Sequence, residues 1–342
     1  MIRLQILGIA IAALAVAPAS ADPSYVKFTV DGAVSTDASG IDGGGNVGGY
    51  YATATGKCRA GCGFVRAPDG TISTFVVKGC TSGMEIRGMN ALGDMIGFCR
   101  DKATAFSFIR ASDGTITRVK RMKDSTATLN AISSTGITGG DFLSPYGFQP
   151  FLRMPDGSKR VLEGVKHRVG SVEGISPSGI LTGEIATVPS SPAQAFIDVP
   201  GEKIQTVSIP DFSWAMGRAI NDAGDVAGMC GNTNQPPQGF VRNADGSTQT
   251  FDLGVTVQGN VWVSALATVD TDRQVAGHAS NDSNEHGFGF IRHDSGAIET
   301  FDISGNKAPS AGTYVTGVSD TGVAVGSYID QHYRHHAFIR MP

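Results

Sequence analysis

A glycine and a phenylalanine recur together along this chain, and their spacing constrains the fold more than any other feature. The glycine ends one short apolar run in seven places: Gly49, Gly97, Gly140, Gly183, Gly228, Gly277 and Gly326. The phenylalanine lies in the next run, also in seven places: Phe64, Phe108, Phe151, Phe196, Phe240, Phe290 and Phe338. Successive members are 43 to 50 residues apart. This period favours four-stranded propeller blades, because helical repeats of this length need long 3.6-residue periodicity, which the chain lacks.

Turn signals divide each repeat into four short strands. In the fifth repeat, Asn221-Asp222-Ala223-Gly224 separates the first strand from the second, and Asp245-Gly246 separates the third from the fourth. The first turn carries a glycine in six repeats: Gly45, Gly93, Gly136, Gly179, Gly224 and Gly322. The sixth repeat has Arg273 there, so we expect it to turn differently. The pattern predicts antiparallel four-stranded meanders.

The two ends of the sequence complement each other. The seventh repeat stops at Pro342, after its third strand, whereas residues 25–31 resemble a fourth strand with no repeat of its own. Pairing residues 25–31 with the last repeat would join the ends of a ring and protect an open edge. We therefore expect one all-β domain over residues 22–342, a seven-bladed β-propeller with four antiparallel strands per blade.

Residues 1–21 have the features of a signal peptide. Arg3 is followed by the apolar run Ile6–Val16, which is too short to span a membrane, and Ala19-Ser20-Ala21 is a small-residue cleavage site. We expect cleavage before Asp22 and an exported protein, periplasmic or extracellular. The net charge of -4 gives no reason to expect nucleic acid or an anionic membrane surface as a partner.

The repeat resembles a known family. The pattern Gly-Ile-Asn-x-x-Gly-x-Val-x-Gly followed by His-Ala-Phe or Gly-Phe is similar to the HAF family of bacterial extracellular repeats, and His336-Ala337-Phe338 matches its signature literally. The resemblance covers nearly all of residues 22–342. It implies export and a propeller-like repeat fold, and it brings no catalytic residues with it.

All five cysteines fall on or near the face that should carry the long loops between second and third strands. An oxidising compartment favours disulfides, and the preferred pairs are Cys58 with Cys62 and Cys80 with Cys99, which leaves Cys230 free. A cysteine metal site is the alternative, although the spacing fits no zinc motif.

Six of the seven histidines lie in the last two repeats, and several share that face. The candidate set for a divalent transition metal is His278, His286, Asp330, His332 and His335. Imidazole with carboxylate is a common ligand set for such a metal. The competing interpretation is ordinary polar loop residues that hold no ligand. No other cofactor is indicated.

Aromatic side chains gather on the same face. Exposed, the four residues Trp214, Trp262, Tyr314 and Tyr333 would suit a sugar or another flat ligand. The alternative is packing between blades, because Trp is usually highly buried. An arginine also follows the recurring phenylalanine in six repeats, at Arg66, Arg110, Arg153, Arg242, Arg292 and Arg340. We interpret these arginines as structural, each bonding its own hairpin.

The chain contains no nucleophile elbow, no phosphate-binding glycine loop and no zinc-protease motif. The sequence favours a non-enzymatic binding or scaffold module that uses its long-loop face, with carbohydrate or protein at the cell envelope as the partner. The alternative is a propeller enzyme, a lyase or hydrolase acting on a polysaccharide or another secreted polymer. Propellers serve both purposes, so the fold does not decide between them.

Overall fold

The computed structural model describes residues 22–101, 104–122, 125–162, 168–187, 191–233, 237–253, 261–269, 273–281, 286–308 and 311–342, of which 168, 261–269 and 281 are described as backbone only. These residues form β-strands and no helix, so the described part of the chain contains no helix suited to crossing a membrane. The all-β class predicted from the sequence is confirmed.

Four repeats each form a separate four-stranded antiparallel sheet in chain order. The second repeat contains β6 (Gly83–Met89), β7 (Met95–Arg100), β8 (Ala105–Arg110) and β9 (Ile116–Arg118). The third contains β10 (Ala127–Ile132), β11 (Thr138–Ser144), β12 (Gly147–Arg153) and β13 (Lys159–Val161). The fourth contains β14 (Arg168–Ile175), β15 (Leu181–Thr187), β16 (Gln194–Asp198) and β17 (Gln205–Val207). The fifth contains β18 (Trp214–Ile220), β19 (Val226–Gly231), β20 (Gln238–Arg242) and β21 (Thr248–Phe251).

The other three repeats have the same internal order. The first contains β2 (Ala33–Ile41), β3 (Val47–Thr53), β4 (Cys62–Arg66) and β5 (Ile72–Phe75). The sixth contains β22 (Val261–Val269), β23 (Val275–Asn281), β24 (Gly287–Arg292) and β25 (Ile298–Phe301). The seventh contains β26 (Gly312–Val318), β27 (Ala324–Ile329) and β28 (His335–Met341). Single parallel pairs, Gly287 with Gly312 and Ser35 with His335, join these three repeats into one sheet, and an N-terminal strand brings it to twelve strands.

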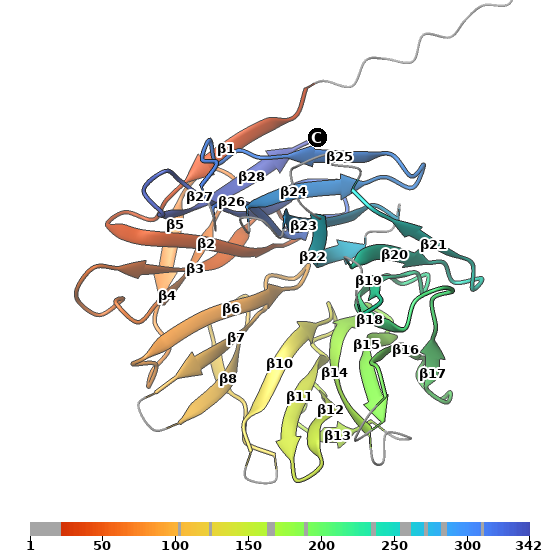
Figure 1. Cartoon of the computed structure of the whole chain (residues 1–342). Helices are drawn as coiled ribbons and strands as arrows, with labels where there is room; N and C mark the ends of the chain where they lie inside the picture. Colours follow the sequence, from red (N-terminus) through yellow and green to blue (C-terminus); the bar gives the residue numbers. More distant parts are fainter. Residues whose placement is uncertain are drawn as a thin grey trace, which may run out of the picture.

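The N-terminal strand completes the seventh repeat. β1 (Ser24–Phe28) pairs antiparallel with β28, from Ser24 opposite Met341 to Phe28 opposite Ala337, and the two strands lie side by side at the top of Figure 1. The pairing predicted for residues 25–31 is confirmed, but the strand ends earlier, at Phe28. It ends there because a turn follows, in which the Ala33 amide donates to the Val30 carbonyl and Gly32 adopts a φ of 73°.

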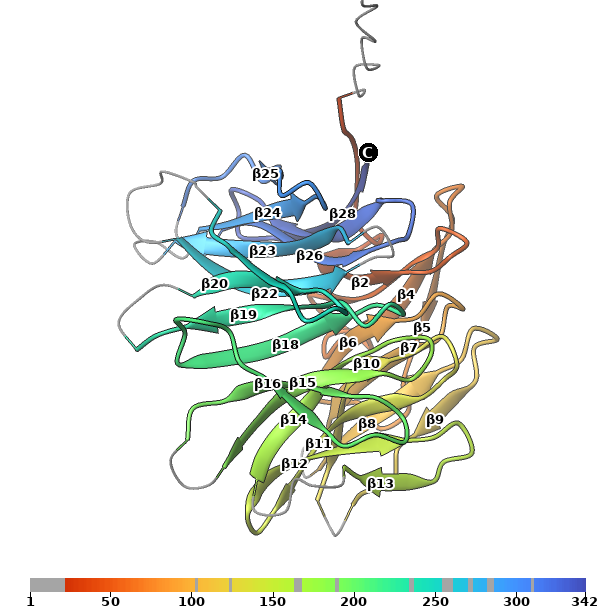
Figure 2. The same cartoon turned by 90° about the vertical axis from the view of Figure 1, so that its right-hand side faces the viewer.

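The first strands of successive repeats contact one another in a circuit. Contacts run from β2 to β6, β10, β14, β18, β22 and β26, and from β26 back to β2. The later strands of each repeat extend outward from this circuit, as the two perpendicular views show (Figures 1 and 2). This is the arrangement expected of propeller blades around an axis.

The recurring glycine and phenylalanine face each other across the second and third strands. All seven glycines are the direct pairing partners of the seven phenylalanines. Each of these phenylalanines is fully buried. A Cβ at Gly228 would lie 2.4 Å from the Phe240 ring and 2.2 Å from the Met216 carbonyl oxygen. Glycine is needed at this position because the ring and a first-strand carbonyl occupy the space of a side chain; at Gly140 the Thr128 carbonyl is the nearest obstacle.

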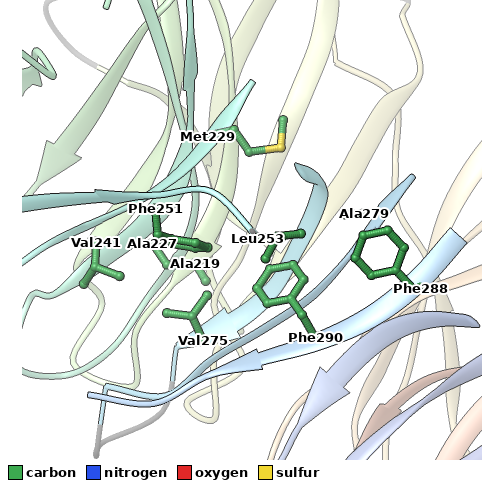
Figure 3. Packing of buried hydrophobic residues seen from close by; sticks show 10 residues of the cluster. All are labelled: Ala219, Ala227, Met229, Val241, Phe251, Leu253, Val275, Ala279, Phe288 and Phe290. Atoms are coloured by element: carbon green, nitrogen blue, oxygen red, sulfur yellow. The ribbon is translucent and has the colours of Figure 1, made fainter. Parts of the chain in front are cut away.

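Hydrophobic clusters fill the spaces between neighbouring sheets. Figure 3 shows the cluster between the fifth and sixth repeats, where the rings of Phe251 and Phe290 lie 6.0 Å apart at a steep angle. Val241 and Val275 come from the two facing sheets of the same cluster. These contacts hold each sheet against the next, which fixes the position of the first strands around the axis.

Five of the six arginines after the phenylalanines stabilise their hairpins, as predicted. They donate from Nη1 to the carbonyl of the following residue at 3.2 to 3.3 Å, namely Arg66, Arg110, Arg153, Arg242 and Arg292. The prediction is wrong for Arg340, which instead pairs with Glu299 of the sixth repeat. The turn aspartates act separately, because Asp69 accepts from the Thr71 amide at 2.8 Å. Arginine and aspartate therefore stabilise the same hairpin through different backbone groups.

Arg273 does not behave as expected. It stands where the other repeats have a first-turn glycine, yet its φ of 58° is in the same left-handed region as the 86° of Gly224. Its Nε lies 3.1 Å from Oδ2 of Asp225, a buried carboxylate of the neighbouring repeat. This ion pair offsets the cost of left-handed backbone at a residue with a Cβ.

Candidate functional site

Every first strand has a β-bulge at the same position, directly after the residue that pairs with the recurring glycine. The extra residue is Ser39, Arg87, Asn130, Glu173, Arg218, Ala267 and Thr316 in repeats one to seven. A bulge bends its strand and redirects a side chain. The sequence reasoning missed this series, although it has a signal: a variable residue precedes a small residue and then Ile, Met or Val, as in Arg87-Gly88-Met89.

Six of the bulge residues line two cavities on the axis of the circuit. We call Ser39, Arg87, Asn130, Glu173, Arg218 and Thr316 the axial ring. The larger cavity, here the axial cavity, has a volume of about 470 Å³ and extends toward Asp37 and His335. The smaller cavity, of about 210 Å³, extends toward the first-turn ends of the strands at Ile41 and Ile220. The axial cavity is therefore on the side of the long loops.

Long polar side chains form one half of the axial ring. Arg87 Nη1 donates to Asn130 Oδ1 at 3.0 Å, and Asn130 Nδ2 lies 3.3 Å from Glu173 Oε1. Glu173 Oε2 is in turn 3.2 Å from Arg218 Nη1. The network therefore connects the second, third, fourth and fifth repeats around the axis.

Two carboxyl groups behind this half are partly desolvated. Burial raises the pKa of Asp141, against the effect of hydrogen bonds from Asn130 and Ser171. Burial also raises the pKa of Glu184, against the positive charge of Arg218, and its Oε2 has no hydrogen-bond partner among the described residues. The cavity itself is lined by the carboxyl groups of Asp37 and Glu173 and by the guanidinium groups of Arg87 and Arg218.

The other half of the ring has short side chains. Thr316 Oγ1 donates to the Ala38 carbonyl at 2.9 Å, and Ser39 is its neighbour in the first repeat. The space in front of these residues is bounded by Tyr50, Tyr314 and His278. The cavity thus has an aromatic side and a charged side.

His335 and Asp37 form an acid–base pair in the wall of the axial cavity. His335 Nδ1 lies 2.8 Å from Asp37 Oδ1. The hydrogen bond to Asp37 raises the pKa of His335, with burial acting in the opposite direction. Nδ1 carries the proton of this bond, so Nε2 remains the basic nitrogen of the neutral ring.

The remaining aromatic side of the cavity is electrically neutral. Burial lowers the pKa of His278, whose Nδ1 donates to the Val315 carbonyl at 3.2 Å. The centroids of the His278 and Tyr314 rings are 5.2 Å apart, in an edge-to-face arrangement. The Tyr314 hydroxyl donates to the Ala311 carbonyl at 3.1 Å. Burial raises the pKa of Tyr50, and the negative charges of Asp37 and Glu85 raise it further by a smaller amount. His278 and Tyr50 therefore stay uncharged at neutral pH.

The structure brings His278 and His335 into one cavity and places the other predicted metal ligands elsewhere. His286 is buried, with Nε2 3.0 Å from Asp302 Oδ2. Burial opposes ionisation of Asp302, but hydrogen bonds from Ser304, His286 and Lys307 outweigh it and lower its pKa to about 2. His332 is exposed on a turn.

Asp330 organises that turn. Its Oδ1 accepts from the amides of His332 and Arg334 at 2.8 and 2.9 Å, and its Oδ2 lies 3.0 Å from His336 Nε2. Burial raises the pKa of Asp330, but these hydrogen bonds outweigh it and lower the value to about 2. Within the described ranges, no group of three or more His, Cys, Asp and Glu side chains is placed to hold a metal ion. The metal site stays a prediction that a zinc titration would test.

The predicted aromatic ligands also separate. Tyr314 lines the axial cavity, whereas Trp214 is partly buried against the cluster of Figure 3. Tyr333 is 60 % exposed, with a φ of 58°, in the turn that Asp330 organises. Trp262 belongs to β22, of which the backbone alone is described. The sequence analysis missed another exposed apolar group, which lies in the third repeat and consists of Leu143, Tyr146 and Phe148.

Both expected disulfides are present. Cys58 is bonded to Cys62, and Cys80 to Cys99. Cys230 is a buried free thiol, and burial raises its pKa to about 12. The first two repeats thus each contain one covalent crosslink on the long-loop side.

Comparison with known proteins finds similarity in structure and none in sequence. No protein-family model and no curated protein matches the sequence. Inactive virginiamycin B lyase from Staphylococcus aureus, solved with quinupristin, has a TM-score of 0.61 at 12 % identity over 94 % of this chain and 100 % of that one. YCF48 bound to D1 peptide has a TM-score of 0.56 at 11 % identity over 94 % and 97 %.

A prolyl endopeptidase has a TM-score of 0.62 at 11 % identity over 90 % of this chain and 48 % of that one. Identities this low say nothing about activity. The structural matches agree with the circuit of outward-facing sheets. The matches and the circuit together show that this chain folds as a β-propeller.

Proposed function

We propose that the chain is an exported, seven-bladed β-propeller of the HAF type. The blade number is supported by seven glycine–phenylalanine pairs, seven bulges and the circuit of first strands. Export is supported by the signal-like residues 1–21 and by two disulfides, which persist in oxidising compartments. The HAF assignment rests on the repeat pattern and on His336-Ala337-Phe338.

The protein acts as a binding module whose ligand enters the axial cavity from the long-loop side. The observation that carries this function is the cavity itself, to which first strands from six repeats contribute a bulge residue. Ligand sites are concave and combine apolar or aromatic walls with a few oriented polar groups. A bulge can change its side chain without altering the core, which suits a binding position on a rigid scaffold.

The chemistry of the walls favours a carbohydrate end group. Tyr50 and Tyr314 provide flat neutral rings on one side, where a sugar ring can stack. Arg87, Asn130 and Glu173 provide donors and acceptors for hydroxyl groups on the other side. Glu173 is paired with Arg218, and Arg87 is paired with Glu85, so no charged group of the ring is left unpaired to select an ion.

A glycan array followed by calorimetric titration of the best sugar tests the binding function. The double variant Asp37→Asn with His335→Gln should weaken binding at least tenfold, because both residues line the cavity. The matched control is Asp320→Asn with His332→Gln, the same two changes at exposed positions. Equal affinities for the two double variants, or no sugar bound at all, would contradict the proposal.

A second candidate is the propeller enzyme, a lyase or hydrolase acting on a polysaccharide. It is favoured by the Asp37–His335 pair, which holds a basic ring nitrogen in the cavity beside Tyr50. Incubation with a panel of polysaccharides, with products detected by mass spectrometry, tests it. His335→Gln should abolish product, a larger loss than its effect on sugar affinity. Turnover that persists in this variant would exclude His335 as the base.

A further inference from the structure

A basic crevice lies between the second and third repeats, away from the axis. Its volume is about 340 Å³, and Phe106 and Val119 form part of an apolar floor. Arg118, Lys120 and Arg121 line it and are exposed. The crevice is at the start of β8 and β10 and beyond the end of β9, which is the long-loop end of these sheets.

The positive charge of the crevice is not neutralised by the described residues. None of Arg118, Lys120 and Arg121 has a carboxylate within salt-bridge distance there. The Arg118 guanidinium instead lies over the Phe106 ring, 3.7 Å from its centre. The Lys159 ammonium donates to the Lys120 carbonyl, and burial with the positive charges of Arg153 and Lys120 lowers the pKa of Lys159. The field is therefore locally positive in a chain of net charge -4.

An apolar hairpin tip adjoins this crevice. Leu143, Tyr146 and Phe148 at the β11–β12 connection are 53 %, 64 % and 55 % exposed. Ala127 lines the crevice and pairs with Phe142 of β11. Leu143, the first residue of the tip, directly follows Phe142. The sheet that carries it, β10 to β13, lies at the lower edge of Figure 1.

The tip is held in a defined shape by its own hydrogen bonds. Ser144 Oγ accepts from the Tyr146 amide at 3.1 Å and donates to the Gly147 carbonyl at 2.9 Å. Gly147 has a φ of 108°, a conformation that side chains rarely adopt. Apolar side chains are thus displayed outward by a turn that the sequence specifies.

We propose that the long-loop end of the second and third repeats is a docking surface for an anionic phospholipid bilayer. Leu143, Tyr146 and Phe148 enter the interfacial region, where aromatic and aliphatic side chains are stable. The three cations of the crevice bind lipid phosphates, because charge attraction to an anionic surface is the second signal that stable peripheral binding needs. Leu143 favours a bilayer over an acidic polysaccharide, since an aliphatic side chain offers no stacking face. This surface is separate from the axial cavity.

Co-sedimentation of the chain over residues 22–342 with vesicles tests the surface. The bound fraction should rise about tenfold when phosphatidylglycerol is added to phosphatidylcholine vesicles, and it should fall with added salt, which screens charge. Equal binding to both kinds of vesicle, or no binding to either, would overturn the proposal. Full displacement by inorganic phosphate would also overturn it, because the crevice would then be a simple anion site.

Two variants separate the parts of the surface. Leu143→Ser with Phe148→Ser should lose vesicle binding at every salt concentration, whereas Lys120→Gln with Arg121→Gln should lose only the part that depends on phosphatidylglycerol. The matched controls, Val34→Ser with Leu92→Ser and Lys57→Gln with Arg59→Gln, make the same changes at other exposed positions and should bind like the parent. Controls as impaired as the test variants would overturn the assignment. Unchanged near-ultraviolet circular dichroism shows that each variant is folded.

Discussion

His335 Nδ1 and Asp37 Oδ1 are 2.8 Å apart, although 298 positions separate the two residues in the chain. Asp37 lies in β2 of the first repeat and His335 begins β28 of the seventh, so the bond crosses the junction where the two ends of the propeller meet. The junction and the axial cavity therefore share this acid–base pair. A change in the protonation of His335 acts on both.

The first prediction concerns pH. The pKa of His335 is raised in the folded state, so the pair stabilises the fold fully below the unfolded histidine value of about 6.5 and loses its effect as pH rises through the folded value. His335→Gln should therefore lower the melting temperature more at pH 5.5 than at pH 8. The effect should be below about 1 kcal/mol, because the side chain is 42 % exposed. Equal losses at both pH values would refute the ion pair.

The second prediction concerns the glycine–phenylalanine pairs. Gly228→Ala should destabilise the fold by about 3 kcal/mol or more, because the new Cβ would meet the Phe240 ring and a backbone carbonyl. Gly83→Ala is the matched control, since its Cβ would meet nothing within 4 Å. Urea unfolding of both variants measures the difference. Similar midpoints would show that the sheets adjust to a methyl group at the centre of the repeat.

The third prediction concerns β1. Deleting residues 22–31 should lower the stability of the whole domain in one cooperative transition, because it exposes the edge of β28 and removes the Phe28–Phe64 and Tyr25–Phe301 ring contacts. Deleting only residues 22–23, which precede the strand, is the control. Thermal unfolding followed by circular dichroism measures both. A deletion variant that melts like the control would show that the pairing contributes nothing.

The fourth prediction concerns the cysteines. Peptide mapping without reduction should find Cys58 linked to Cys62 and Cys80 to Cys99, with Cys230 unmodified by iodoacetamide until the protein is unfolded. Burial keeps the Cys230 thiol protonated, with a pKa of about 12, and only the thiolate reacts. Rapid labelling of Cys230 in the folded protein would contradict its burial.

The sequence predicted the parts of the fold that local chemistry determines. Glycine recurs opposite phenylalanine because a strand carbonyl and the ring leave no room for a side chain, and this signal can be read from the repeats alone. The hairpin arginines and the β1 pairing follow from the same comparison among repeats. The disulfides could be predicted from the sequence because Cys58 and Cys62 are close in the chain and Cys80 and Cys99 belong to the same repeat.

The axial ring was not predicted, because its residues share a position in the repeat and not a chemistry. Arg87, Asn130 and Glu173 look unrelated until the bulges show that they occupy one place in three repeats. The histidines illustrate the converse, since closeness in sequence suggested one group, whereas His286 and His335 each bond a different carboxylate. Arg273 shows that an ion pair between repeats can support a turn position that otherwise holds glycine. Such a contact cannot be predicted from the sequence of the turn alone.

The pairing of β1 with β28 also governs when this protein can finish folding. Ser24 and Met341 are partners, so every repeat between them must be synthesised before the first strand meets its mate. During that interval β1 is an unpaired edge that neighbouring chains could capture. Repeats two to five, whose sheets pair only within themselves, can form as they emerge. Assembly is therefore local through most of the molecule and becomes global only at its final strand.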